Sequence, residues 1–529
     1  MPPAAEHLRR QAKACLLGGQ WTAAQTALEA LLRLQPDDVH ASLQLGEVLR
    51  AGGNMRAASQ TWLSLLPHLP ADAAFIAQLA TCLYFNGESH AARQCFEHAE
   101  VTRTDSAQAL LALVRARQLL DEPAATLHLL ERALAAGIDT PDEHLTRALM
   151  LEFTGQTEAA TSELQHCLQR WPRFSGAALT LMRLRRQTDA RHLATLRQHL
   201  QCIPLGVNPG IDTAYAEFQF ATFKLLDDLG RHDEAWTALA AGNATMHRLH
   251  PYDASGHTAA IDAIIAQSPA DATHATATVT DTGPLPIFIV GLPRSGSTLL
   301  ERALSNHSQV ASAGELGDFA RQLRWCSNTP ERGPGDLARL IARSAAIDPN
   351  ELGRRYLAQT RWRAGGRQFY VDKLPNNYLF VDWIHRALPS APIVHIHRAP
   401  MDACFSNFKA MFGASLIHTC DMPALAHHYS QYRRLMAHWQ QRLPRRVLDV
   451  AYAQLVTDPD HTIARVLQHC GLAPEDACLH PESNRAAVST FSSTQVRDPI
   501  HTRSLNTWRH YEAALRPLRD ALQSFGIEP

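Results

Sequence analysis

The chain has 529 residues, of which 46% are hydrophobic, and its 50 Lys and Arg against 51 Asp and Glu give a formal net charge of −1. This length predicts two or three domains with apolar cores. The near-neutral charge argues against nucleic acid or an anionic membrane as a bulk partner.

The ten cysteines are scattered without a CxxC pair, which argues against a structural zinc site and against a disulfide framework. The N-terminus lacks an apolar signal segment. No stretch has the ~18 apolar residues that a membrane helix needs. We therefore expect a soluble cytoplasmic protein.

The first third of the sequence repeats with a period of 34 residues. The same slot of each copy holds Gly19, Gly53, Gly87, Asp121 and Gly155. Alanine follows four positions later in every copy, at Ala23, Ala57, Ala91, Ala125 and Ala159. A glycine that ends one helix, with a small residue that lets the next helix pack closely, is typical of tetratricopeptide repeats. We place the repeats at about 5–38, 39–72, 73–106, 107–140 and 141–174.

The 34-residue frame breaks after residue 174. Residues 175–205 are rich in arginine and have a helical pattern, and one degenerate repeat is predicted near 211–245. We therefore assign residues 1–245 to an all-α helical solenoid. Residues 246–285 are assigned to a helix and a linker, because 267–285 are small and polar.

From residue 286 onwards, short apolar runs alternate with helical patterns. Strands are predicted at 287–291, 309–312, 369–372, 392–397 and 446–450. Helices are predicted at 298–305, 377–388, 401–411, 423–441, 460–470 and 508–524. This alternation predicts a P-loop-like, three-layer α/β domain over 286–529 with a parallel sheet, whose ligands bind at the carboxyl ends of the strands.

A phosphate-binding loop is predicted where the first of these strands ends. Gly291 and Gly296 are five positions apart, as in a Walker A loop, but Ser297 stands where that motif needs lysine. The loop offers an anion its backbone N–H groups, hydroxyls and one guanidinium. The residues that supply them are Arg294, Ser295, Gly296, Ser297, Thr298 and Leu299. The missing lysine indicates a phosphate donor other than a nucleoside triphosphate.

Polar residues follow three more of the predicted strands. Arg398 leaves the fourth strand and Ser406 comes eight residues later, a spacing that suits a second phosphate site. Lys373 follows the third strand, where it would neutralise charge on a leaving phosphate. Glu315 follows the second strand, and the absence of a Mg²⁺-binding pattern around it indicates a general base.

Together these residues resemble the sulfotransferase family that uses 3′-phosphoadenosine 5′-phosphosulfate (PAPS), over about 286–525. With its repeats the chain is similar to bacterial members that carry a tetratricopeptide array, and more distantly to tyrosylprotein sulfotransferases. The resemblance implies that Pro293 to Thr298 form the 5′-phosphosulfate loop, and that Arg398 and Ser406 bind the 3′-phosphate. It also implies that Glu315, twenty-one positions after Arg294, is the base.

The same resemblance gives roles to three further residues. Lys373 matches a lysine that precedes a proline-containing turn, Tyr452 a tyrosine that packs near the adenine, and Ser492 a serine that assists at the sulfate. Thr507 departs from the pattern, because relatives have Lys or Arg before the tail tryptophan. Arg503 or Arg509 is a candidate substitute.

A second departure is Gly314, which replaces an acidic residue of the tyrosylprotein branch and weakens the case for a tyrosine acceptor. His307, His395 and His397 have no third ligand at a suitable spacing, so we predict packing roles and no metal. The expected reaction is in-line transfer of a sulfuryl group from PAPS to an acceptor hydroxyl, which carries less charge than phosphoryl transfer and needs no Mg²⁺ cage.

The partners stay open at this point. The repeats could recruit a protein or peptide for sulfation, shape the acceptor cleft, or drive homodimerisation. Two other functions compete with sulfuryl transfer. A P-loop kinase or NTPase would need the lysine that Ser297 replaces. A non-catalytic tetratricopeptide scaffold with a nucleotide-binding domain would tolerate a degraded loop, whereas the loop here is intact.

Overall fold

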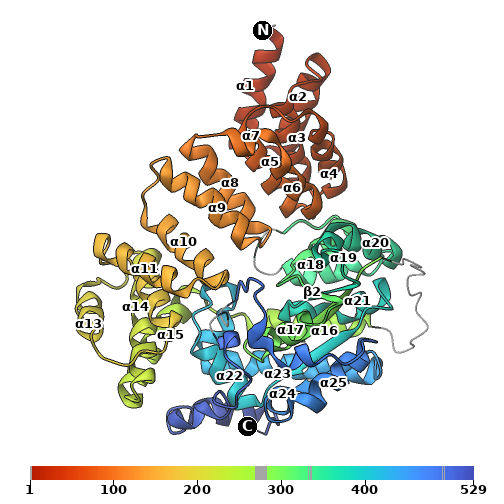
Figure 1. The fold of residues 1–529 in the computed structure, drawn as a ribbon. Coiled ribbons are helices and arrows are strands. Elements are labelled where there is room, and N and C mark those ends of the chain that lie inside the picture. Colours follow the sequence, from red (N-terminus) through yellow and green to blue (C-terminus); the bar gives the residue numbers. More distant parts are fainter. Residues whose placement is uncertain are drawn as a thin grey trace.

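The computed structural model of the chain describes residues 3–268, 283–331, 333, 336–490, 493 and 495–528 (Figure 1). Most of the linker predicted at 267–285 lies outside these residues. An array of antiparallel helices fills the first half of the chain, and a parallel sheet covered by helices fills the second half. The fold class predicted from the sequence is confirmed.

The array is built from helical hairpins. Its helices are α1 (Pro3–Leu17), α2 (Trp21–Leu34), α3 (Val39–Ala51), α4 (Met55–Leu63), α5 (Ala73–Phe85), α6 (Ser89–Gln94), α7 (Ala99–Arg103), α8 (Ala107–Leu119), α9 (Pro123–Ala135), α10 (Pro141–Phe153), α11 (Thr157–Arg170), α12 (Ser175–Leu184), α13 (Leu193–Cys202), α14 (Pro209–Asp228) and α15 (His232–Leu249). In Figure 1 the array runs from the N-terminus, away from the sheet, round to α14 and α15 beside the C-terminal domain.

The repeated glycines do what their residue type predicts. Gly53, Gly87 and Gly155 turn the chain between paired helices with φ of 88°, 88° and 84°, a left-handed conformation that glycine adopts without steric cost. One position after the repeated alanine slot, Ala58 and Ala92 in the second helix of their hairpins are almost fully buried, whereas Ala23 and Ala159 of the slot itself are exposed. The small side chain thus lets the two helices of each hairpin approach closely.

Within the described residues, one sheet contains five parallel strands in the order β2-β3-β1-β4-β5. Their bounds are β1 (Leu285–Gly291), β2 (Val310–Ser312), β3 (Phe369–Asp372), β4 (Ile393–His397) and β5 (Val447–Ala451). In register, Phe288 pairs with Asp372 on one side and with Ile393 on the other. The strand β1 is therefore central, and the loop that follows it opens at the middle of the sheet edge.

Helices cover both faces of the sheet. Their bounds are α16 (Ala254–Gln267), α17 (Ser297–Ser305), α18 (Asp318–Cys326), α19 (Asp336–Ser344), α20 (Pro349–Thr360), α21 (Val381–Ala387), α22 (Pro400–Phe408), α23 (Met422–Arg442), α24 (Tyr452–Thr457), α25 (Pro459–His469) and α26 (Arg516–Ser524). Ile287 and Ile289 belong to the core on the side of α17 and α25. Phe288 and Val290 point to the other core, with α20, α21 and α23. This alternation is what a strand buried on both faces requires.

The turns of the array dock on the C-terminal domain. The Gln322 side chain donates to the carbonyl of Gly87 at 2.6 Å. Arg363 donates to the carbonyl of Leu120 at 2.8 Å, and Arg497 donates to that of Phe153 at 3.1 Å. Successive hairpins of the array are thus held by α18, by the segment after α20 and by the tail of the domain.

The helix predicted at 508–524 is wrong in its first half. Residues Thr507–Tyr511 form a 3₁₀ turn, and α26 starts only at Arg516. Pro517 explains the break, because proline fits the first turn of a helix but removes a hydrogen bond from its interior.

We expect Gly46→Ala to destabilise the protein by about 1–3 kcal/mol, the usual cost of overpacking. Alanine normally stabilises a helix more than glycine does. At position 46, however, a Cβ would overlap the buried indole of Trp62. Thermal and urea unfolding measure the change. Gly18→Ala is the matched control, because the nearest atom to its Cβ is at 3.4 Å. Equal stability of the two variants would contradict the close helix packing described for the array.

Candidate active site

The loop after β1 depends on two glycines and a left-handed arginine. A Cβ on Gly291 would overlap the carbonyl of Ile396, and a Cβ on Gly296 would overlap the ring of Tyr452. Arg294 and Gly296 have φ of 65° and 97°. Because Gly296 carries no side chain to cap α17, the first N–H groups of that helix are available to an anion.

The residues predicted to bind a second phosphate lie next to this loop. Arg398, at the end of β4, donates from Nη1 to the carbonyl of Arg294 at 3.4 Å, and its guanidinium lies 4.8 Å from the ring centre of Tyr452. Asp402 forms an ion pair with Arg398 at 3.9 Å. Ser406 lies on α22 and is buried at the same cavity. The fold thus brings Arg294, Arg398, Ser406 and Tyr452 together, as the sequence predicts.

Lys373 is a fully buried cation among carboxylates. Its Nζ lies 2.6 Å from Oε1 of Glu315 and 3.8 Å from Oε2 of Glu301. Burial alone would lower the pKa of Lys373, but Glu315 and Glu301 outweigh it and raise the pKa above its usual value. Burial raises the pKa of Glu301, against the effect of Lys373. Lys373 is therefore held protonated directly beneath Glu315.

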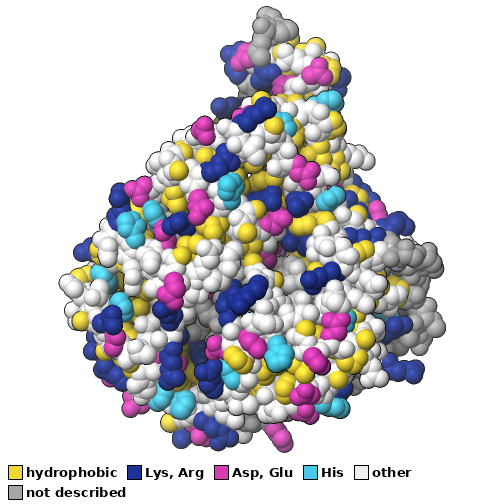
Figure 2. All heavy atoms as spheres, in the orientation of Figure 1, with side chains coloured by type: hydrophobic (Ala, Val, Ile, Leu, Met, Phe, Trp, Pro, Cys, Tyr) yellow, Lys and Arg dark blue, Asp and Glu magenta, His cyan; other side chains and the backbone are white. Residues whose placement is uncertain are grey.

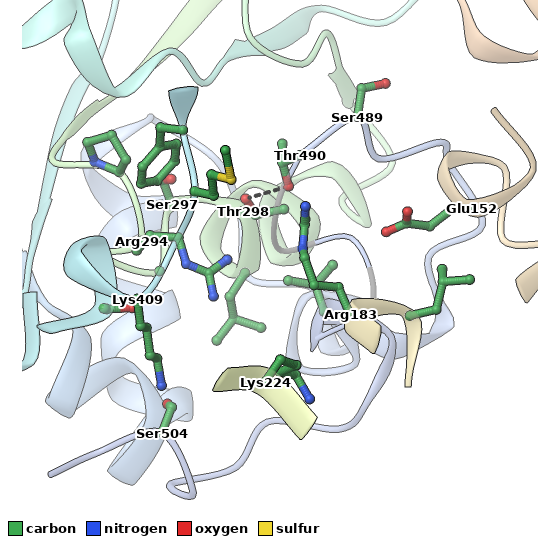
Figure 3. Close-up of a pocket in the computed structure, with 18 of the residues that line it drawn as sticks. Glu152, Arg183, Lys224, Arg294, Ser297, Thr298, Lys409, Ser489, Thr490 and Ser504 are labelled. Carbon is green, nitrogen blue, oxygen red and sulfur yellow. Dashed lines mark hydrogen bonds between the residues drawn. The ribbon is translucent and has the colours of Figure 1, made fainter. Parts of the chain in front are cut away.

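A cavity of about 1220 Å³ opens between the array and the domain. Its domain side includes Arg294, Ser297, Thr298, Glu315 and Arg398. Its array side comes from α10, α12 and α14 and includes Leu145, Leu149, Glu152, Phe153, Leu179, Arg183 and Lys224. Figure 2 shows the molecule hollowed in this region, with Lys and Arg side chains along the hollow. The cavity wall opposite the phosphate loop is therefore made by helices of the array (Figure 3).

The positive charges in this cavity affect one another. Burial, followed by Arg183 and Arg398, lowers the pKa of Arg294 to about 10. Burial, together with Arg294, Arg398 and Lys224 and against the opposing effect of Asp227, lowers the pKa of Lys409 to about 8. Like charges gathered away from water are costly unless an anion joins them. A bound anion would offset this repulsion.

The other sequence-predicted site residues are placed as follows. Gly296 and Leu299 line the cavity, and Ser295 is buried behind the loop. Arg503 lies at the cavity edge, exposed and paired with Asp498 at 2.8 Å. Ser492 lies outside the described residues. The neighbouring Thr490 does line the cavity, with its hydroxyl 3.4 Å from that of Thr298.

Sequence reasoning missed Asp121, which lies behind the Glu315 loop. It occupies the slot that holds glycine in the other repeats, yet it keeps the left-handed turn with a φ of 53°. Its carboxylate would lie 2.7 Å from a Cβ on Gly314, and it accepts a hydrogen bond from Ser489. Burial raises the pKa of Asp121. The signal was present as the exception in the glycine frame.

Lys409 and Arg183 were missed as well. Lys409 follows Ser406 by one helical turn, so the same helix face that carries the serine also points the lysine into the cavity. Arg183 belongs to the arginine-rich stretch where the repeat frame breaks. Nothing in the sequence places α12 opposite the phosphate loop, because that depends on the curvature of the array.

The histidines serve as hydrogen-bonding groups in the fold. His395 lies 2.6 Å from Asp449 through Nδ1, and His307 lies 2.9 Å from the carbonyl of Ala473 through Nε2. Within the residues that the structure describes, no cluster of three or more His, Cys, Asp or Glu side chains is arranged to hold a metal ion. None of the helices in this part of the chain combines the length and apolar composition that a bilayer crossing requires.

Residues 286–476, which include β1 to β5 and the phosphate loop, match the sulfotransferase family. This match covers most of the parallel sheet and its helices in the second half of the chain. An uncharacterized protein of Aquifex aeolicus (strain VF5) is 28% identical over 317 residues, which cover 58% of this chain and 41% of that protein.

The nodulation protein NoeE of Sinorhizobium fredii is 27% identical over 265 residues, which cover 43% of this chain and 61% of that protein. The chain thus spans less than two thirds of the length of either relative. Among solved structures, the sulfotransferase domain of the olefin synthase of Synechococcus PCC 7002 is 21% identical, covers 48% of this chain and 100% of that domain, and has a TM-score of 0.33.

We expect Gly296→Ala to destabilise the protein by about 1–3 kcal/mol through its overlap with Tyr452. Gly413→Ala is the control, because Gly413 also has a positive φ of 62° but no described atom lies within 4 Å of its Cβ. Thermal unfolding of both variants separates overlap from backbone strain. In a Tyr452→Ala background the extra cost of Gly296→Ala should disappear, and its persistence would contradict this contact.

Proposed function

We propose that this protein is a PAPS-dependent sulfotransferase whose acceptor hydroxyl enters the cavity between the helical array and the α/β domain. One observation carries the proposal. A phosphate loop without the Walker lysine is hydrogen-bonded, through Arg398 to the carbonyl of Arg294, to a second buried basic site. PAPS carries anionic groups at both its 5′ and its 3′ ends, which suits two adjoining basic sites.

The residues present fit such a donor. A Cβ on Gly296 would fill the cradle above Tyr452. Among the described residues, the buried Ser295 hydroxyl and the Nε atom of Arg398 have no hydrogen-bond partner, a state that buried polar groups rarely keep without a ligand or water. The loop N–H groups, Arg294 and Thr298 would hold the 5′ end. Arg398, Ser406 and Lys409 would hold the 3′-phosphate.

When bound, PAPS supplies the sulfuryl group: the bond from sulfur to the acceptor oxygen forms as the bond from sulfur to the 5′-phosphate oxygen breaks, and the bonding electron pair stays with that phosphate. The hydroxyl proton goes to the carboxylate of Glu315. The loop N–H groups and Arg294 stabilise the negative charge on the leaving side, as preorganised donors do.

The pair between Lys373 and Glu315 couples the two sides of the site. Lys373 donates from Nζ to Oε1 of Glu315 at 2.6 Å, so this oxygen would be open to the acceptor hydroxyl only after Lys373 turns to another anion. The donor's phosphate competes for Lys373 through its own negative charge. Lys373 would then neutralise the leaving group, and Glu315 would be a base only while donor is bound.

The cavity limits the acceptor to a molecule that reaches Glu315 past the array. Leu145, Leu149 and Phe153 give that route an apolar side, and Glu217 and Lys224 add polar groups to it. An acceptor with an apolar body and a free hydroxyl fits this lining. It could be a peptide, a lipid-like molecule or a metabolite, and a protein or peptide held by the repeats stays part of the proposal.

We expect adenosine 3′,5′-bisphosphate, the product of the donor, to bind the wild type, and Arg398→Ala to weaken it at least tenfold, since charged hydrogen bonds contribute about 1.5–3 kcal/mol. Calorimetric titration measures both affinities. The matched control is Arg191→Ala, which removes an exposed arginine that pairs with Asp189 and does not line the cavity, and which should stay within about threefold of the wild type. No binding by the wild type, or tighter binding of ATP with Mg²⁺, would refute the sulfotransferase proposal.

Lys409 should make this binding depend on pH. Its pKa of about 8 means that the ammonium is partly lost in the free protein above pH ~8, whereas a bound phosphate favours the ammonium. Affinity for adenosine 3′,5′-bisphosphate should therefore fall between about pH 7 and pH 9, by at most about tenfold per unit, with proton uptake detectable as different binding heats in Hepes and Tris. Lys409→Met should bind more weakly at pH 7 and lack this decline. An identical decline in the variant would show that another group titrates.

A further inference from the structure

The array presents a cation to the phosphate loop. Arg183 lies near the end of α12 and lines the cavity opposite Ser297 and Thr298. In Figure 3 its guanidinium extends from the array toward the hydroxyls of Thr298 and Thr490, and Arg294 faces the same space from the domain. This residue belongs to neither the predicted repeats nor the part of the chain that matches the sulfotransferase family.

The pKa of Arg294 agrees with a nearby Arg183. After burial, Arg183 has the largest effect among those that lower the pKa of Arg294. The pKa of Arg183 is itself lowered by burial, with Glu152 opposing the shift. The hydroxyl of Ser493 donates a hydrogen bond to Oε1 of Glu152. Two guanidinium groups that share a poorly solvated space repel each other, and a bound anion between them reverses the sign of that interaction.

Arg183 lies on the side of the cavity where the 5′ end of the donor would bind. Lys409 and Ser504 lie together on the other side of the cavity in Figure 3, near Arg398, which donates to the carbonyl of Ser504. Arg183 extends instead toward Thr298 in the first turn of α17, the helix end to which the loop leads. An anion held by that helix end would thus have a guanidinium on each side.

We propose that Arg183, contributed by the helical array, binds the 5′-phosphate or phosphosulfate end of the donor together with Arg294 and Thr298. This rests on the proposed function. The α/β domain would then hold an incomplete donor site without α12, and the array would be part of the catalytic centre rather than an appended recruitment module. During transfer Arg183 would share the charge that develops on the leaving phosphate.

The test is calorimetric titration of adenosine 3′,5′-bisphosphate and of adenosine 3′-monophosphate into the full-length wild type and Arg183→Gln. We expect the variant to bind the bisphosphate at least tenfold more weakly, in line with the loss of a charged hydrogen bond. Binding of the 3′-monophosphate, which lacks the 5′ group, should change less than about threefold. Arg398→Ala should weaken both ligands.

The matched control is Arg185→Gln, which removes a nearby array cation that pairs with Glu158 and is 44% exposed in its side chain. Its affinity for the bisphosphate should stay within about threefold of the wild type, because a screened surface charge contributes little. If Arg183→Gln binds like the wild type, or if Arg185→Gln loses as much, Arg183 is no donor ligand and the inference falls while the proposed function stands.

Unliganded stability separates binding from folding. Because Arg183 and Arg294 repel each other, Arg183→Gln should melt at the same temperature as the wild type or higher when no ligand is present. A lower melting temperature together with weaker binding would assign Arg183 a structural role with Glu152 and overturn the inference. Failure of the wild type itself to bind adenosine 3′,5′-bisphosphate would instead refute the sulfotransferase proposal, and the Arg183 role with it.

Discussion

The concentration of positive charge in one poorly solvated cavity is the constraint on which the rest of the structure depends. Burial lowers the pKa values of Arg294, Arg398 and Lys409. Arg398 further lowers the pKa of Arg294, and both arginines further lower the pKa of Lys409. Such an arrangement costs folding free energy and persists only where the surrounding structure enforces it. The parallel sheet supplies that enforcement, because its strand ends fix where Arg294 and Arg398 leave the backbone.

The array and the α/β domain act as one structural unit around this cavity. Hairpin turns of the array meet the domain at Gly87, at Asp121 and next to Gly155. The turn nearest to Glu315 is the one that lacks glycine: Asp121 accepts an uncommon backbone conformation there and places a carboxylate behind the Glu315 loop. A strained residue at a repeat position is more easily understood as a requirement of the site than of the solenoid.

Much of the C-terminal domain could be predicted from local sequence. The five strands are predicted by short apolar runs. The phosphate loop is predicted because its glycines and polar residues follow the first of these runs, where their roles depend on local backbone geometry. The period of 34 residues likewise predicted helical hairpins. The helical pattern over 508–524 predicts the helix in its second half correctly. It fails in the first half, because Pro517 marks the start of α26 and not a position inside a longer helix. Arg183 was out of reach, because its place opposite Thr298 depends on the small rotations that accumulate along the array. Asp121 left a signal only as the exception to glycine in the repeat frame. Lys409 could have been found from its one-turn spacing after Ser406.

The same reasoning explains why the sequence predicts the proposed donor site better than the proposed acceptor route. In the proposed function, backbone N–H groups and cations at strand ends would bind the donor, and a sequence specifies these groups. The proposed acceptor route lies between α10, α12 and α14 and the domain, and its shape is a property of the assembled molecule. A crystal structure of the full chain with adenosine 3′,5′-bisphosphate tests the central claim most directly. We expect the 5′-phosphate on the N–H groups of Gly296 to Thr298 with Arg183 and Arg294 on either side, and the 3′-phosphate on Arg398 and Ser406. A nucleotide bound elsewhere, or a 5′-phosphate that Arg183 does not approach, would contradict the view that the array and the domain share one active site.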